Sequence, residues 1–435
     1  MAPTAILPGG QYFTVDDGKM GRVAETYGKS IGLSEFKLTT PLRQGTAVLL
    51  HFDMFHRGTK RLEEDSGHPH RPMIKFQFFR TSEPTAPSWD CPGGQLVEET
   101  PFAFTGAPQY KQAIWEEIYR WMGGQEQTAK HVGKEEEDLV DVLALAAAMQ
   151  DDAVDAEQLR IGSGYSLGQA ASKGNAEALQ ALLTAIDSPE QSERRAAMWG
   201  LSCSGGSAMG ALMERVALTP PDTEKNLERL ADLILALGEA AQAPVSNVVE
   251  VIGGVMSTVH ATIDVSDEVT LEQTKSEWRR STAFCSPEFR QMYGRKEWEA
   301  LASAAQSLMC VAQTAAAAHD IEGCVDVLAL ASKYSAVDIN LGPTTRHNAC
   351  MSMLALTPPG LLPPDAAAQL EGVFAAAAED DDRYVMSVGV EGLRRLNLPS
   401  AEEMASDPSA MSKASLLNEL AFMRFCPINS PTSPF

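Results

Sequence analysis

The residues with the clearest chemical potential lie between Gly45 and Arg80. Alternating apolar residues predict a strand over 47–56 that ends at His56, followed by an irregular loop and a strand that begins at Arg71. If the two strands pair as an antiparallel hairpin, His56 and Arg71 approach each other in one cavity. An imidazole nitrogen is a good ligand for non-haem Fe(II), and a guanidinium binds a carboxylate through two parallel hydrogen bonds. The pair therefore predicts a metal ion beside a carboxylate-binding arginine.

An H-x-D motif at His51 and Asp53 offers a second histidine and a carboxylate. Alternate side chains of a strand point to opposite faces, so His51 and Asp53 fall on the face opposite to His56. They are therefore the less favoured candidates for ligands of the same ion. Two plainer readings stay open: His56 as a surface histidine at a strand end, and Arg71 as a loop arginine paired with nearby carboxylates.

The segment from Gly45 to Arg80 resembles the C-terminal strands of the phytanoyl-CoA dioxygenase family of Fe(II)/2-oxoglutarate oxygenases. In that family a strand ends in an iron-binding His and is followed by the Arg that binds the far carboxylate of 2-oxoglutarate; His56 and Arg71 match these positions. The opening APTAILPGGQYF is similar to the family's strand and Pro-Gly turn. The resemblance implies Fe(II) and 2-oxoglutarate as cofactors and hydroxylation of a small-molecule substrate, such as an acyl-CoA ester.

The resemblance covers about the first 120 residues and begins in the middle of the family's domain. The family's iron site takes two His and one carboxylate, and the motif that supplies one His and the carboxylate precedes the Pro-Gly turn. The matching residues would lie before Met1. We therefore expect either a piece of an active oxygenase or a degenerate, non-catalytic relative, and no activity from the chain as written.

Charge divides the chain into two parts. The net charge is −23, yet residues 1–91 carry eleven Lys and Arg against ten Asp and Glu, so the rest of the chain is strongly acidic. Such a surface disfavours nucleic acid and anionic membranes as partners. No apolar run reaches roughly 18 residues, the length of a membrane-spanning helix. The seven cysteines are scattered without a C-x-x-C pair, which favours reduced thiols and a cytoplasmic protein.

Helical repeats are predicted beyond the acidic stretch 135–157. Segments that start at Tyr165, Ala196 and Ala231 each read as an apolar helix, a turn of small residues and a second amphipathic helix. One glycine recurs in each of these units: Gly168, Gly200 and Gly238. Two helices of this length cannot bury their apolar faces alone and must stack on neighbours. The units resemble HEAT-type repeats, above all at 380–396; an unrelated helical domain is the alternative.

Together these patterns predict an α+β multidomain protein in which a partial double-stranded β-helix (jelly-roll) precedes an all-α HEAT-like solenoid. The expected parts are 1–125 for the oxygenase-like domain, 126–160 for an acidic linker and first helix, 161–400 for the helical repeats, and 401–435 for a terminal helix and a Pro/Ser-rich tail. Two functions follow. The first is an Fe(II)/2-oxoglutarate-dependent dioxygenase; the alternative is a non-catalytic HEAT-repeat scaffold whose acidic surface suits a basic protein partner.

Overall fold

The computed structural model describes residues 4–6, 37–38, 56–58, 141–151, 156–263, 296–336, 342–380 and 382–397. Most of these residues lie in α-helices. Three short strands are also described: β1 (Thr4–Ile6), β2 (Lys37–Leu38) and β3 (His56–Gly58). β1 pairs antiparallel with both β2 and β3, which gives the order β2-β1-β3.

The predicted α+β fold with a partial jelly-roll is wrong. The described residues from 141 onward form an all-helical, solenoid-like stack, and the three short strands before them form no jelly-roll. A strand was expected to end at His56, whereas β3 begins there. Alternating apolar residues specify which side chains share a face but not which strand is the neighbour, and strands of two or three residues bury too little to define a sheet fold.

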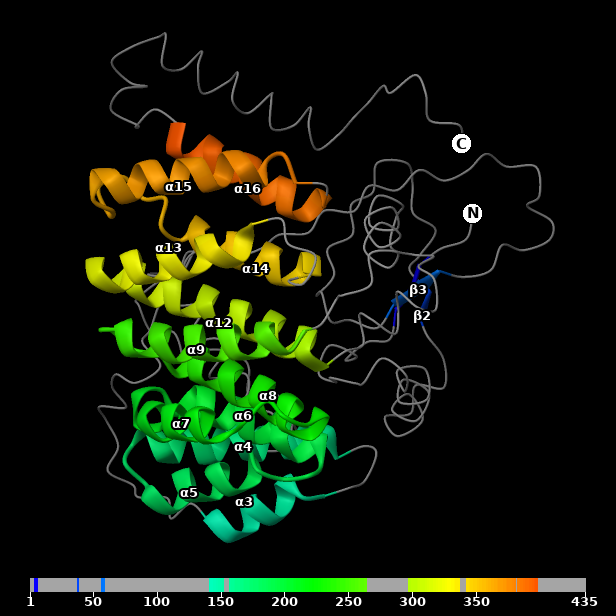
Figure 1. Cartoon of the computed structure of the whole chain (residues 1–435). Helices are drawn as coiled ribbons and strands as arrows, with labels where there is room; N and C mark the ends of the chain where they lie inside the picture. The colour runs from blue at the N-terminus through cyan, green and yellow to red at the C-terminus, as the bar shows by residue number, and fades with distance from the viewer. Residues whose placement is uncertain are drawn as a thin grey trace, which may run out of the picture.

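The helices form two layers (Figure 1). The inner layer consists of α4 (Glu157–Ser172), α6 (Gln191–Ser204), α8 (Glu224–Ala240), α12 (Lys296–Ala318), α14 (Gly342–Leu354) and α16 (Arg383–Asn397). The outer layer consists of α5 (Ala176–Ala185), α7 (Gly206–Leu218), α9 (Ser246–Thr262), α13 (Ile321–Ser335) and α15 (Pro364–Ala377). The short α3 (Val142–Met149) packs on α4 and α5 at the start of the stack. Because each inner helix packs on the next, the layers form one continuous solenoid-like body.

Local sequence signals set where the helices begin. Asn175, Thr223 and Asp320 are N-caps, and the side-chain oxygen of each accepts a hydrogen bond from the backbone N–H three residues later. The Asp320 carboxylate also accepts a bond of 2.9 Å from the N–H of Val245 in the turn before α9. Gly205 joins α6 to α7 with a φ of 55°, a conformation that glycine adopts without steric cost.

The glycines that recur in the sequence lie where consecutive inner helices cross. A Cβ placed on Gly238 of α8 would be 2.6 Å from the Cα of Ser307 on α12. One placed on Gly168 of α4 would overlap the carbonyl oxygen of Gly200 on α6. Only a residue without a side chain allows backbones to approach this closely. The spacing of the glycines therefore reflects the stacking of the inner layer.

The core lies between the two layers and is built from Leu, Ile, Val and Ala side chains. In α8, Leu233, Ile234 and Leu237 have no exposed surface, and Val248 and Ile252 of α9 are equally buried. These positions follow the spacing of one helical face, so each hairpin buries its apolar stripe against its neighbours. In the part of the chain that the structure describes, no helix is both long and apolar enough to cross a membrane.

The crossing of α8 and α12 gives a first testable prediction. Gly238→Ala should destabilise the protein by about 1–3 kcal/mol, because the new methyl group meets backbone atoms of Ser307 and forces the two helices apart. Gly254→Ala is the matched control: a Cβ there meets nothing within 4 Å, so this variant should be about 0.5–1 kcal/mol more stable. Urea unfolding measures both values, and equal effects would contradict the packing explanation.

Candidate functional site

Of the residues predicted to form an iron and 2-oxoglutarate site, the structure describes His56. Its backbone lies in β3, opposite Ile6 of β1. Arg71, His51 and Asp53 lie outside the described residues, so the approach of His56 and Arg71 stays a prediction. Within the described segments, no group of three or more His, Cys, Asp or Glu side chains could hold a metal ion.

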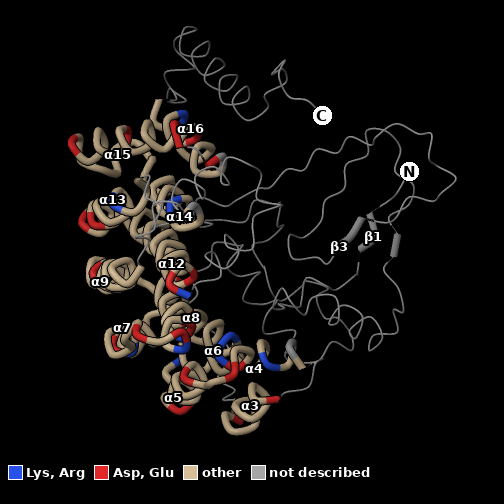
Figure 2. Tube along the Cα trace, turned by 45° about the vertical axis from the view of Figure 1, so that its right-hand side comes forward, with Lys and Arg blue, Asp and Glu red and all other residues tan. Residues whose placement is uncertain are grey.

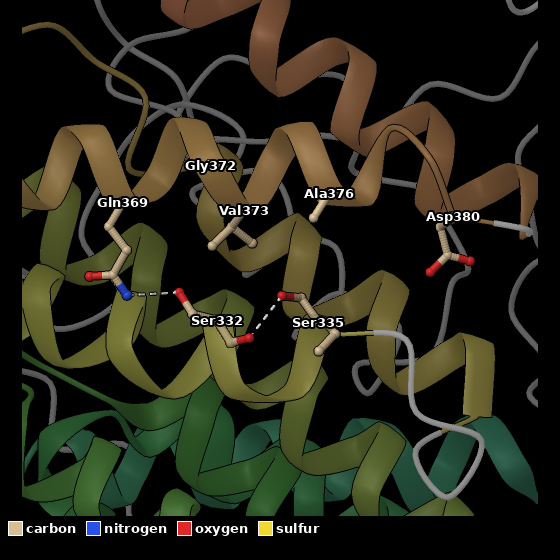
Figure 3. Close-up of a pocket in the computed structure, with 8 residues that line it drawn as sticks. Ser332, Ser335, Gln369, Gly372, Val373, Ala376 and Asp380 are labelled. Carbon is tan, nitrogen blue, oxygen red and sulfur yellow. Dashed lines mark hydrogen bonds between the residues drawn. The ribbon is translucent and has the colours of Figure 1, made fainter.

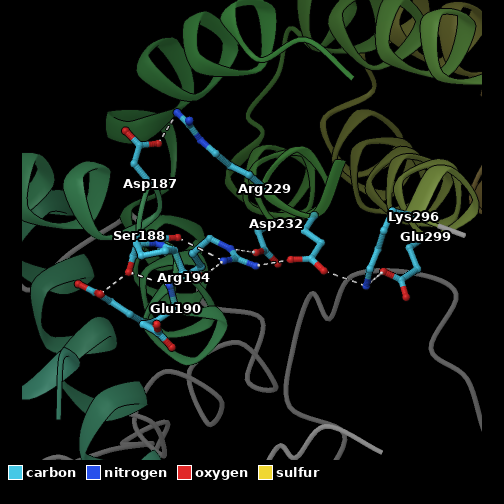
Figure 4. A network of polar contacts seen from close by, with 11 residues as sticks. Asp187, Ser188, Glu190, Arg194, Arg229, Asp232, Lys296 and Glu299 are labelled. Carbon is cyan, nitrogen blue, oxygen red and sulfur yellow. Dashed lines mark hydrogen bonds and ion pairs between the residues drawn. The ribbon is translucent and has the colours of Figure 1, made fainter. Parts of the chain in front are cut away.

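A chain of charged side chains links three inner helices, α6, α8 and α12 (Figure 4). Arg194 of α6 is 3% exposed, and its Nε donates to Oδ2 of Asp232 on α8 at 2.8 Å. Glu228 of α8 lies 3.4 Å from Arg194 Nη2 and 3.1 Å from the Nζ of Lys296 on α12. Positive and negative charges thus alternate from α6 through α8 to α12.

The charges of this network satisfy one another. Burial raises the pKa of Asp232, although the hydrogen bond from Arg194 acts in the opposite direction. Burial alone would lower the pKa of Lys296, but the hydrogen bonds to Glu299 and Glu228 outweigh it, and the pKa is raised. Because each cation faces a carboxylate, the network holds the helices in register and presents little unbalanced charge to a ligand.

A second charged contact is fully buried near the other end of the stack. Arg346 of α14 and Asp380, which follows α15, are 1% and 0% exposed. Nε and Nη2 of the arginine donate to the two carboxylate oxygens at 3.1 and 2.9 Å. Asp380 also accepts a bond from the N–H of Asp382, just before α16. Burial, and then the charge of Asp380, raises the pKa of Cys350 to about 12, so this thiol stays protonated at neutral pH.

Unlike the paired carboxylates of the inner network, carboxylates on the outer layer are exposed. We call five of them, one on each outer helix, the outer carboxylates: Glu177 on α5, Glu214 on α7, Glu250 on α9, Glu322 on α13 and Asp365 on α15. None of these side chains forms an ion pair or a hydrogen bond within the described ranges. Figure 2 shows acidic residues along the whole outer column of helices. The outer carboxylates therefore give this face a negative charge that no described side chain neutralises by an ion pair.

A groove between α13 and α15 contains a hollow of about 250 Å³ (Figure 3). Its lining comes from the C-terminal half of α13 and from α15: Ser332, Ser335, Ala336, Gln369, Gly372, Val373, Ala376 and Asp380. Gln369 Nε2 donates to Ser332 Oγ at 3.3 Å across the groove. Because Asp380 is neutralised by Arg346, the walls present small apolar groups and neutral hydroxyl and amide groups.

A polar cluster between α9 and α13 has the residue types of a nucleophilic site. Ser257 Oγ lies 3.2 Å from the hydroxyl of Tyr334, and Lys333 Nζ donates to Ser257 Oγ at 3.3 Å. Lys333 also lies 5.1 Å from the centre of the Tyr334 ring, a cation–π contact. A lysine that donates a hydrogen bond to the hydroxyl is not placed as its base, so the contact joins α9 to α13 and does not activate Ser257.

Comparison with known proteins gives no functional assignment. No family model matches the chain, and no curated protein matches it.

The sequence predicted that the C-terminal part is acidic, but not that exposed carboxylates line the outer layer. A signal was present, because Glu177, Glu214 and Glu250 are 37 and 36 residues apart, close to the spacing of the glycines. The groove had no such signal. Gly372 and Ala376 are ordinary residues of an Ala-rich helix, and only the packing shows that no described side chain fills the space beside them.

The buried ion pair gives a second prediction. Arg346→Met should cost about 3–5 kcal/mol of stability, because it leaves the Asp380 carboxylate buried without its partner. Adding Asp380→Asn should recover part of the loss, which a double-mutant cycle in urea measures. Arg395→Met, which breaks a half-exposed pair with Glu391, is the control and should cost about 1 kcal/mol or less. If the stability losses of the two single variants, Arg346→Met and Asp380→Asn, add up to the loss of the double variant, the two side chains are not directly coupled.

Proposed function

We propose that this protein is a helical-repeat scaffold that binds a basic protein partner on the outer face of its stack. The observation that carries the proposal is the contrast between the layers: the inner network is paired, whereas the outer carboxylates are exposed and unpaired. Unpaired charges of one sign on one face add up to a field that attracts a partner of the opposite sign. A stack of helical hairpins also offers the long surface on which repeat proteins bind other chains.

A cytoplasmic location is part of the proposal. None of the four described cysteines, Cys203, Cys310, Cys324 and Cys350, is in a disulfide, and all except Cys310 are buried. Buried cysteines outside disulfides are typical of a reducing compartment, which supports this location.

Neutralising the outer carboxylates tests the scaffold proposal. The variant changes Glu177, Glu214, Glu250 and Glu322 to Gln and Asp365 to Asn; the control changes the same number of carboxylates, Glu135, Glu136, Glu137, Glu402 and Glu403, to Gln. Binding of a labelled Lys-rich peptide, followed by fluorescence anisotropy at low and moderate salt, should be about tenfold weaker for the variant. Equal affinity of variant and control would show that the outer face is not the binding surface.

A second candidate function rests on the residue pattern of 45–80. We propose that Arg71 binds the far carboxylate of 2-oxoglutarate and that His56 is an iron ligand, as the resemblance to phytanoyl-CoA dioxygenases implies. The antiparallel pairing of β1 with β3 supports this, because it brings the strand before the Pro-Gly turn beside His56. His56 is the one predicted ligand among the described residues, so the structure provides no iron site from which a reaction could be derived.

Thermal unfolding with Fe(II) and 2-oxoglutarate tests this second candidate. A formed site should raise the melting temperature, because a ligand that binds only the folded state stabilises it. Arg71→Ala should abolish the shift, whereas Arg80→Ala, a nearby arginine with no predicted role, should retain it. A shift that survives Arg71→Ala would remove this residue as the anchor, and no shift in the unmodified chain would remove the candidate function.

A further inference from the structure

We propose that the groove between α13 and α15 is the docking site for an amphipathic helix of the partner, with basic side chains beside its apolar stripe. This inference rests on the proposed scaffold function and deepens it, because it places the contact on the outer face and states the chemistry of the bound segment.

An apolar stripe leads along α13 into the hollow. Ile321 and Val325 are 40% and 36% exposed, so two aliphatic side chains reach the surface in the first half of α13. They lie at i and i+4 on the helix, and Ser332, at i+11, falls on the same side. The stripe therefore runs from two exposed aliphatic side chains to Ser332 in the lining of the hollow.

The groove is open because α15 presents small residues to it. A Cβ on Gly372 would meet nothing within 4 Å, and Ala376 lies one turn further along the same wall. The hollow of about 250 Å³ falls below the roughly 300–1,000 Å³ of small-molecule sites. Figure 3 shows side chains from both helices beside this space. It therefore suits one or two side chains of a docked helix better than a whole small-molecule substrate.

The charge beside the groove selects a basic occupant. Glu322 follows Ile321 on α13, and Asp365 lies one turn before Gln369 on α15; both are exposed and without ion pairs within the described residues. The basic residue next to Ser332, Lys333, is turned towards α9, where it bonds to Ser257. A helix lying along the stripe would place its flanking Lys or Arg side chains near the two carboxylates, whereas acidic flanks would be repelled.

A designed peptide on the full chain tests the proposal. The probe is a labelled helix of roughly 18 residues with Leu at i, i+3, i+4 and i+7 positions and Lys elsewhere. Two control peptides carry Glu in place of Lys, or the same residues in an order without an apolar face. The Lys helix should bind, and both controls should bind at least about tenfold more weakly.

Blocking the groove makes the test specific. Gly372→Leu adds a side chain to the lining of the hollow at an exposed position where a Cβ meets no described atom within 4 Å, so the protein should stay folded. Gly254→Leu on α9 is the matched control, because it adds the same side chain at an equally open outer-layer glycine. The first variant should weaken binding of the Lys helix about tenfold, and the second should leave it unchanged. Thermal unfolding of both variants checks that they are folded.

The outcomes separate the two proposals. If the variant with neutral outer carboxylates loses the peptide and Gly372→Leu retains it, the groove proposal is overturned and the outer-face proposal stands. If neither variant loses affinity, or if the Lys helix does not bind at all, both are overturned. If sedimentation shows that the chain self-associates and that Gly372→Leu abolishes this, a second copy is the occupant, and the partner-helix proposal is overturned.

Discussion

The close approach of consecutive inner helices is the constraint on which the rest of the stack depends. At Gly238 and Gly168 the backbones touch where a methyl group would overlap the neighbouring chain. This contact sets the distance between units. It brings Arg194 within reach of Glu228 and Asp232 on the next inner helix. It also makes the outer helices stack in the same order as the inner ones. The charge network and the outer face are consequences of this spacing.

The charged residues of this molecule fall into two groups that differ in burial: paired groups in the interior and hydrated groups on the outer helices. Ionic groups that leave water need close partners, and Arg194, Lys296 and Arg346 all have them. Groups on the outer helices stay hydrated and need none, so their field extends into solvent. A large net negative charge can therefore coexist with a paired interior, because the excess lies where it costs little stability.

The helical part could be predicted from the sequence because its signals are local. Caps such as Asn175, apolar periodicity and the recurring glycines all act within a unit or between adjacent units. The partial jelly-roll was wrong because sheet topology depends on pairing between distant segments, which alternation around His56 does not encode. For the candidate binding face, the acidity could be predicted from the sequence but the groove could not. Its existence depends on which faces of α13 and α15 meet, and that follows from the packing of the whole stack.

Asp320 caps α13 and also links it to the preceding unit. Its carboxylate accepts one hydrogen bond from Gly323 in its own helix and another from Val245 in the preceding unit. Fraying of the first turn of α13 therefore loosens a turn far away in the sequence, and the two amide protons should exchange with solvent together. Contacts of this kind make neighbouring units open cooperatively, although each unit touches only its neighbours. A partner that steadies the first turn of α13 would then also slow opening of the turn before α9.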